Sequence, residues 1–220
     1  MVFEGIFMVR KFVSFFVDGV LSGIIVSIGC TVFIQCDSKA LGALLFSFGL
    51  FVIITFHLGL YTGKTGYLPD NGKKYIIEVL LTLVSNFIGA MTGAFFLRLT
   101  RLGENLDLKA EEILDIKFND SNISVFFLSV FCGIMMYIAV EANKRCILEK
   151  NHVIGSLSVI MPVMIFVYGS FNHSVADFAY FSISGFHNWG RAIGYFPLVV
   201  IGNGVGGMFL PLAKRLSMDK

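Results

Sequence analysis

Long apolar runs, bounded by charged or turn-forming residues, divide the chain into six candidate membrane-spanning segments. The runs cover about residues 12–35, 40–68, 74–97, 123–142, 153–184 and 191–212. A helix needs roughly 20 predominantly apolar residues to cross the hydrocarbon core of a bilayer, and each run reaches that length. The pattern therefore predicts an all-α membrane protein with six transmembrane helices.

The second and fifth runs are longer than a crossing requires, and each contains a polar, small-residue interruption. The interruptions read GLYTGKTG at 59–66 and NHSVAD at 172–177. Non-helical backbone at membrane depth is tolerated only where it is buried in protein or lines a wet cavity. Interruptions at matching places in two halves indicate a transport site between inverted repeats, so we predict that spans 2 and 5 are broken.

The two halves match weakly in sequence. An offset of 113 aligns residues 62–64 with 175–177, and an offset of 117 aligns 85–90 with 202–207. Each half contributes three spans, an odd number, so the second half must enter the membrane from the opposite side. We predict one channel domain over residues 1–220, with inverted repeats at about 12–97 and 123–212 joined by a polar loop at 98–122.

Composition and charge support a membrane protein and set its orientation. Hydrophobic residues make up 56% of the chain and charged residues only 15%, against about 25% charged in a typical soluble domain. The net charge of +2 is too small to indicate a nucleic-acid partner. With both termini inside, ten Lys and Arg residues flank the inner ends of the spans and six the outer ends. The excess predicts cytoplasmic termini in a multi-pass protein of the inner (plasma) membrane.

His173 is the first candidate for chemistry, because an ionisable group at membrane depth is costly unless it is paired or hydrated. An imidazole titrates near neutrality and can share a proton with a passing weak acid. A structural histidine bonded to the broken backbone is the equal alternative. His57, which precedes the first interruption, favours a structural role.

Four further polar residues fall at equivalent places in the two halves. Lys64 and Asp177 occupy matching positions in the interruptions, which predicts an ion pair across the repeat axis with either a structural or a pore role. Asn86 and Asn203 lie inside spans, where an amide usually bonds the backbone of a neighbouring segment. No triad order, metal-ligand spacing or phosphate loop is visible, so we expect no enzyme, no metal and no cofactor.

The motifs around these residues resemble the formate/nitrite transporter family. FSFGL at 46–50 followed by LYTG at 60–63 is similar to its second-span run, FSxGL followed by LFT[GS]. FNHSVAD at 171–177 is similar to its fifth-span signature, GFEHS[IV]AN. NFIGA at 86–90 and GNGVGG at 202–207 resemble its repeated GN[IL][IV]G[AG] motif. The order of the motifs and the two broken spans also match.

The resemblance implies an aquaporin-like fold, a homopentamer with one pore per protomer, and proton-linked passage of small monovalent anions. It assigns His173 to the central histidine, Thr62 to the first broken loop, and Lys117 to a basic residue that draws anions into the outer vestibule. It assigns four apolar residues to the pore constrictions: Phe46, Leu50, Leu60 and Phe166. The chain departs from the family at Asn172, where a glutamate is expected, and at Asp177, where an asparagine is expected.

We therefore predict a pentameric channel in the lipid bilayer for a small monovalent anion or its conjugate acid, such as formate, nitrite, hydrosulfide, acetate or lactate. Anion attraction by Lys117 and proton sharing at His173 would lower the barrier to dehydration. The alternative keeps the fold and changes the solute to ammonia, ammonium or another small polar solute, because Asp177 adds a carboxylate. A membrane assembly protein without conduction is a third possibility.

Overall fold

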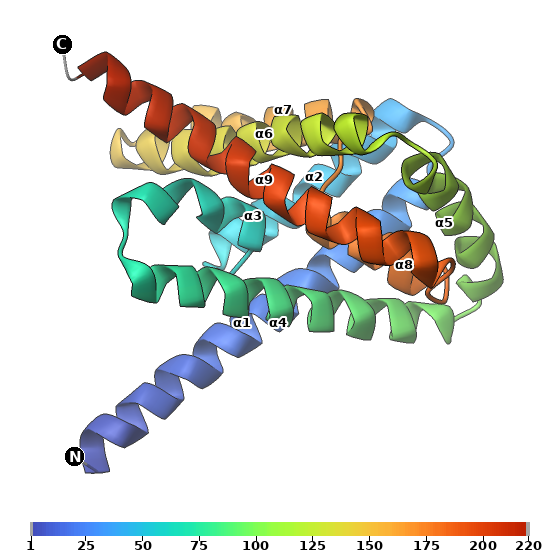
Figure 1. The fold of residues 1–220 in the computed structure, drawn as a ribbon, viewed down its shortest axis with the longest axis horizontal. Coiled ribbons are helices and arrows are strands. Elements are labelled where there is room, and N and C mark those ends of the chain that lie inside the picture. The colour runs from blue at the N-terminus through green and yellow to red at the C-terminus, as the bar shows by residue number, and fades with distance from the viewer. Residues whose placement is uncertain (1, 219–220) are drawn as a thin grey trace.

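The computed structural model describes the backbone of residues 2–218 and the side chains of residues 12–217, and the regular elements in that part are helices (Figure 1). In chain order they are α1 (Val2–Gln35), α2 (Lys39–Thr55), α3 (Tyr61–Lys64), the 3₁₀ helix η1 (Thr65–Asp70), α4 (Lys73–Arg98), α5 (Gly103–Phe118), α6 (Asn122–Leu148), α7 (His152–Tyr168), α8 (Ser174–Ile183) and α9 (Trp189–Met218). The prediction of an all-α protein is confirmed.

Within the described residues, four helices are long and apolar enough to cross a bilayer: α1, α4, α6 and α9. The second and fifth predicted spans have a different form. The apolar helices α2 and α7 contain 17 residues each. Each is followed across a short turn by further helix, α3 and η1 in the first case and α8 in the second.

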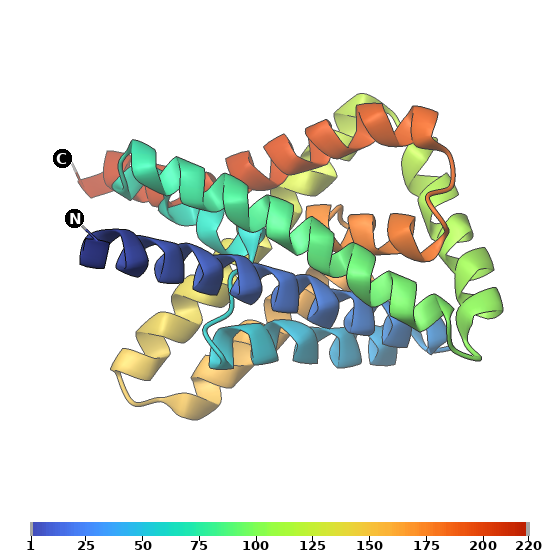
Figure 2. The ribbon, with the colours of Figure 1, turned by 90° about the horizontal axis from the view of Figure 1, so that it is seen from below.

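The segment predicted as a polar loop, 98–122, is largely helical, which corrects that prediction. Helix α5 lies across the end of the bundle opposite both chain termini (Figures 1 and 2). Leu106, Ala110, Leu114 and Phe118 recur every four residues and are buried, and this spacing places them on one face of a helix. Because many charged residues lie between these four, the segment was predicted from the sequence as a polar loop.

Two pairs of long helices cross at backbone contact, α1 with α4 and α6 with α9. A Cβ atom at Gly23 would overlap the backbone of Asn86, and one at Gly206 would overlap Val130. Glycine at these positions lets the helices approach closely, as is typical of packing in lipid. The crossings bring Asn86 of α4 and Asn203 of α9 into the interior.

Candidate functional site

The turns after α2 and α7 have the same backbone conformation. Each begins with a non-glycine residue in the left-handed region, His57 (φ 55°) or Ser170 (φ 58°). The N–H of the next residue, Leu58 or Phe171, then bonds at 2.9 Å to the carbonyl five residues earlier. These bonds end the helices in the manner of a Schellman motif. His57 therefore has a helix-ending role.

Asn86 of α4 holds the first turn through three buried hydrogen bonds. Its Oδ1 accepts from the backbone N–H of Tyr61 at 2.8 Å. Its Nδ2 donates to the carbonyls of Gly59 at 2.8 Å and of Gly19 in α1 at 2.9 Å. One amide thus supplies partners to backbone groups that an interrupted helix leaves open.

Asn203 of α9 makes the same three bonds to the second turn. Its Oδ1 accepts from the N–H of Ser174 at 2.9 Å, and its Nδ2 donates at 2.8 Å to the carbonyls of Asn172 and of Ser129 in α6. Tyr61 and Ser174 are each the first residue of the helix after the turn. The two halves of the molecule therefore share one scheme of contacts.

His173 caps the N-terminus of α8. Its Nδ1 accepts from the N–H of Ala176 at 3.1 Å. Because Nδ1 is an acceptor, the neutral ring carries its proton on Nε2. Nε2 lies 2.9 Å from Oγ1 of Thr62, across the gap between the two turns. The side chain of His173 is thus fixed at both nitrogens and is only 3% exposed.

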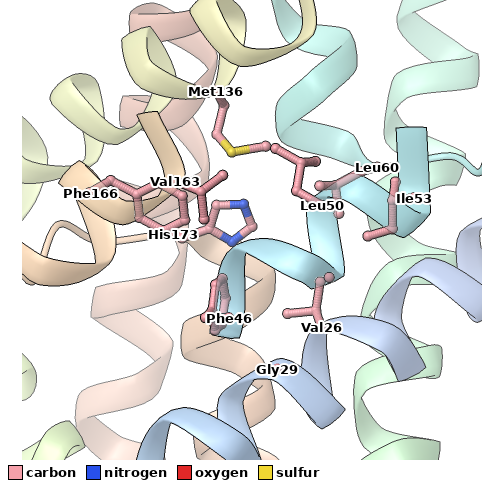
Figure 3. Close-up of a pocket in the computed structure, with 11 residues that line it drawn as sticks. Val26, Gly29, Phe46, Leu50, Ile53, Leu60, Met136, Val163, Phe166 and His173 are labelled. Atoms are coloured by element: carbon pink, nitrogen blue, oxygen red, sulfur yellow. The ribbon is translucent and has the colours of Figure 1, made fainter. Parts of the chain in front are cut away.

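An apolar cavity of about 10 Å³ lies beside the imidazole (Figure 3), with room for roughly one water-sized group. The rings of Phe46 and Phe166 meet edge to face with centroids 6.1 Å apart, and Phe166 stacks on His173 at 5.5 Å. Leu50 and Leu60 also line the cavity. The four residues expected at constrictions and His173 therefore surround one small space.

Wider cavities adjoin this space on two sides. Phe46 and Phe166 also border a cavity of about 360 Å³ next to α5, which we call the outer cavity. Leu50 and Leu60 also border a cavity of about 290 Å³ that contains His57 and Lys64, which we call the inner cavity. The apolar residues thus separate two wider spaces, and His173 borders both the central cavity and the outer one.

Lys117 of α5 is buried in the wall of the outer cavity. Its Nζ lies 3.1 Å from Oδ1 of Asp177 and donates to Oδ1 of Asn172 at 2.8 Å. The two side chains of the ion pair are 10% and 2% exposed. The two residues that differ from the motif, Asn172 and Asp177, therefore contact the same ammonium group.

The predicted ion pair between Lys64 and Asp177 is wrong, because Asp177 pairs with Lys117. Lys64 lines the inner cavity, with Nζ 3.6 Å from the centroid of the Phe15 ring. Asp177 lines the outer cavity. Matching positions in the two turns thus face different cavities and do not meet.

Two residues of the site were not identified from the sequence. The Tyr195 hydroxyl, from α9, donates to Oδ2 of Asp177 at 2.7 Å, so both carboxylate oxygens have partners. Exposed Lys39 also lines the outer cavity and donates to Oγ of Ser170 at 2.9 Å. A tyrosine in an apolar run and a lysine before one are common, and neither gives a local signal.

Among the residues whose side chains are described, no group of three His, Cys, Asp or Glu side chains is placed to hold a metal ion. Cys30 and Cys132 are buried and unpaired as thiols.

Comparisons with known proteins agree with this architecture. The family model described as formate/nitrite transporter matches residues 7–214. A solved structure titled "Pentameric formate channel with formate bound" superposes with a TM-score of 0.77 at 20% identity, over 96% of this chain and 99% of that one. One titled "FNT family ion channel" has a TM-score of 0.76 at 18% identity, over 93% and 90% of the two chains. A search of curated proteins gave no match.

Proposed function

The chain belongs to the formate/nitrite transporter family, a family of membrane transporters and not of enzymes, and on this basis we propose that it conducts a small monovalent anion or its conjugate acid. Formate, nitrite, hydrosulfide, acetate and lactate form the candidate class. The observation that carries the proposal is the fixed Nε2 of His173 in an apolar space between two wider cavities.

In the proposed architecture, α2 with α3 and η1, and α7 with α8, are the two interrupted spans of a six-span inverted repeat. The identical bonds of Asn86 and Asn203 to their turns support it. The pentameric title of one structural neighbour supports a homopentamer. The charge count supports cytoplasmic termini in a plasma membrane, which would place α5 outside.

The solute would enter through the outer cavity and lose water where Phe46 and Phe166 meet. Moving a bare anion into an apolar slit is very costly. A proton shared with the solute spreads the charge and reduces that cost. The anion would therefore cross hydrogen-bonded to the central imidazole.

The shared proton is the one on Nε2 of His173. In the resting arrangement it is donated to Oγ1 of Thr62. A solute oxygen at the same site would take this bond while Nδ1 stays bonded to Ala176. The threonine hydroxyl, released from His173, becomes a second donor. Fixed donors of this kind require little reorganisation when the solute arrives.

The ammonium alternative rested on the carboxylate of Asp177, on the missing glutamate at position 172 and on a second imidazole at His57. Asp177 has a cation and a hydroxyl as partners. Asn172, at the position of the missing glutamate, accepts a hydrogen bond from the same cation. His57 ends α2 in the left-handed region. The contacts of Asp177 and Asn172 therefore favour the anion.

Flux into proteoliposomes tests the proposal directly. Formate, nitrite, hydrosulfide and methylammonium would be compared at two pH values with purified protein. We expect uptake of one or more of the three anions, faster at the lower pH, and little methylammonium uptake. Selective uptake of methylammonium would overturn the anion proposal in favour of the alternative.

A further inference from the structure

A polar pocket outside the proposed pore lies at the end of the bundle that carries both chain termini. It has a volume of about 550 Å³ and is formed by η1 with the C-terminal parts of α6 and α9. Its lining contains four basic and two acidic side chains: Lys144, Arg145, Lys214, Arg215, Asp70 and Glu141. Positive charge is thus in excess.

The two carboxylates are already engaged by the arginines. Arg145 Nε lies 2.8 Å from Oε1 of Glu141, and Arg215 pairs with Asp70. Within residues 12–217, neither Lys144 nor Lys214 forms an ion pair with a carboxylate. Two ammonium groups are therefore available to a ligand, and an anion satisfies them best.

The rest of the pocket wall is aromatic and apolar. Tyr67 and Tyr137 lie with ring centroids 6.1 Å apart, and Pro211 is buried beside them. The Tyr67 hydroxyl donates to the second oxygen of Glu141 at 3.0 Å, and Nζ of Lys144 lies 5.3 Å from the Tyr67 ring centroid. The ammonium group of Lys144 thus lies over an aromatic ring of the pocket wall.

Exposed apolar side chains also lie on both helices before the pocket, on the side toward the middle of the bundle. On α6, Phe131 is 47% exposed, and on α9, Phe209 and Leu212 are 54% and 43% exposed. Lysine beside such residues at the end of a span lies where hydrocarbon gives way to headgroups. A ligand with an anionic head and apolar tails matches both features.

We propose that this pocket binds the phosphate group of an anionic phospholipid, with Lys144 and Lys214 as its cations. The acyl chains lie along the exposed apolar residues of α6 and α9. Basic pockets between membrane helices are suited to such headgroups. The site joins the ends of α6 and α9 to η1, and it does not depend on which solute the pore conducts.

Lipid binding to the delipidated oligomer in mild detergent tests this site. Phosphatidylglycerol and phosphatidylcholine with identical acyl chains would be titrated, with native mass spectrometry and the melting temperature as readouts. The test variant is Lys144→Gln with Lys214→Gln. The control is Lys73→Gln with Lys74→Gln, which removes two exposed lysines of α4 that do not line the pocket. Lys144→Arg with Lys214→Arg keeps the charge.

We expect phosphatidylglycerol to bind and to raise the melting temperature, and phosphatidylcholine to do so much less. The test variant should lose about tenfold or more in affinity, since each lysine near an anionic lipid surface contributes several-fold. The control and the arginine variant should bind as the wild type does. Equal loss in test and control variants would overturn the proposal, as would equal stabilisation by inorganic phosphate alone, which would assign the pocket to a soluble anion.

Discussion

The turn between α2 and α3 and the turn between α7 and α8 have similar backbone conformations but different side chains. Both start in the left-handed region and both are held by an asparagine from a later helix. The residues just before the second helices, Leu60 and His173, have nearly the same conformation, with φ −120° and −114°. Yet one presents an aliphatic group to the central cavity and the other an imidazole.

The two turns are alike in the backbone that the asparagines hold, and they differ in the side chains that could act on a solute. The paired asparagines fix the backbone of both turns, so the side chains there are free to differ. In the second turn and the first residues of α8, Asn172, His173 and Asp177 all have polar partners. At the equivalent place after the first turn, the ammonium of Lys64 in α3 lies against an aromatic ring. We therefore expect the two asparagines to contribute equally to stability, and the side chains near the two turns to contribute unequally to transport.

The largest expected effect tests the equality of the scaffolds. Asn86→Ala and Asn203→Ala each leave three buried backbone groups without their partner, at about 1–3 kcal/mol for each group. Each variant should therefore lose about 4 kcal/mol or more of stability, and by similar amounts, measured by thermal unfolding in detergent. Asn119→Ala, which removes one exposed bond to Asp115, is the control and should cost about 1 kcal/mol or less. A large effect at only one asparagine would break the equivalence.

The next effect tests the asymmetry in charge. Asp177→Asn leaves a buried ammonium without its carboxylate, which typically costs about 3–5 kcal/mol. Adding Lys117→Met should recover much of that loss, whereas adding Lys64→Met should not. Lys64→Met alone should change stability by about 1 kcal/mol or less. The coupling energies come from double-mutant cycles of melting data. Rescue by Lys64→Met would contradict this account and support the Lys64–Asp177 pair that was predicted from the sequence.

A smaller effect tests whether Lys117 accepts a carboxylate at either neighbouring position. Its Nζ is within 3.1 Å of both Asn172 and Asp177. Exchanging the groups, Asn172→Glu with Asp177→Asn, keeps one carboxylate beside the ammonium. The double variant should be about 2 kcal/mol more stable than the sum of the two single variants implies. Simple additivity would show that the position of the charge is fixed by Tyr195 and not by Lys117 alone.

The smallest effect concerns attraction of the solute. The field of Lys117 is neutralised by Asp177, so exposed Lys39 is the cation in the outer cavity that has no carboxylate partner among the described side chains. Lys39→Gln should lower formate flux severalfold at low ionic strength. The effect should vanish near 1 M salt, where the Debye length is about 3 Å. Lys109→Gln, on α5 but outside the cavity, is the control, and equal loss there would rule out a local role for Lys39.

Much of the scaffold could be predicted from the sequence. Runs of apolar residues marked the helices, and the polar interruptions at 59–66 and 172–177 overlapped the ends of the turns at 56–60 and 169–173. Asn86 and Asn203 were recognisable because an amide inside an apolar run needs buried partners. Helix α5 was missed because its four buried apolar side chains are separated by charged ones.

The ion pairs were harder to predict, because they join residues distant in sequence. Repeat symmetry suggested that Lys64 and Asp177 would meet, but symmetry relates positions without bringing them into contact. The partner of Asp177 comes from α5, which lies between the two segments predicted as repeats, and its second partner, Tyr195, comes from α9. Such contacts follow from tertiary packing and have no local pattern.

The central claim is that the chemistry lies at His173 and not at the equivalent Leu60. Formate flux into proteoliposomes, measured across pH, tests this claim. The test variant, His173→Asn, keeps a side chain able to cap α8 but removes Nε2. The matched control is Leu60→Met. We predict that His173→Asn lowers flux by roughly 10–100-fold, the worth of one hydrogen bond to a charged group, and removes its pH dependence, whereas Leu60→Met, which changes only the apolar wall, leaves the pH dependence unchanged. Wild-type flux with an unchanged pH profile in His173→Asn would contradict the account.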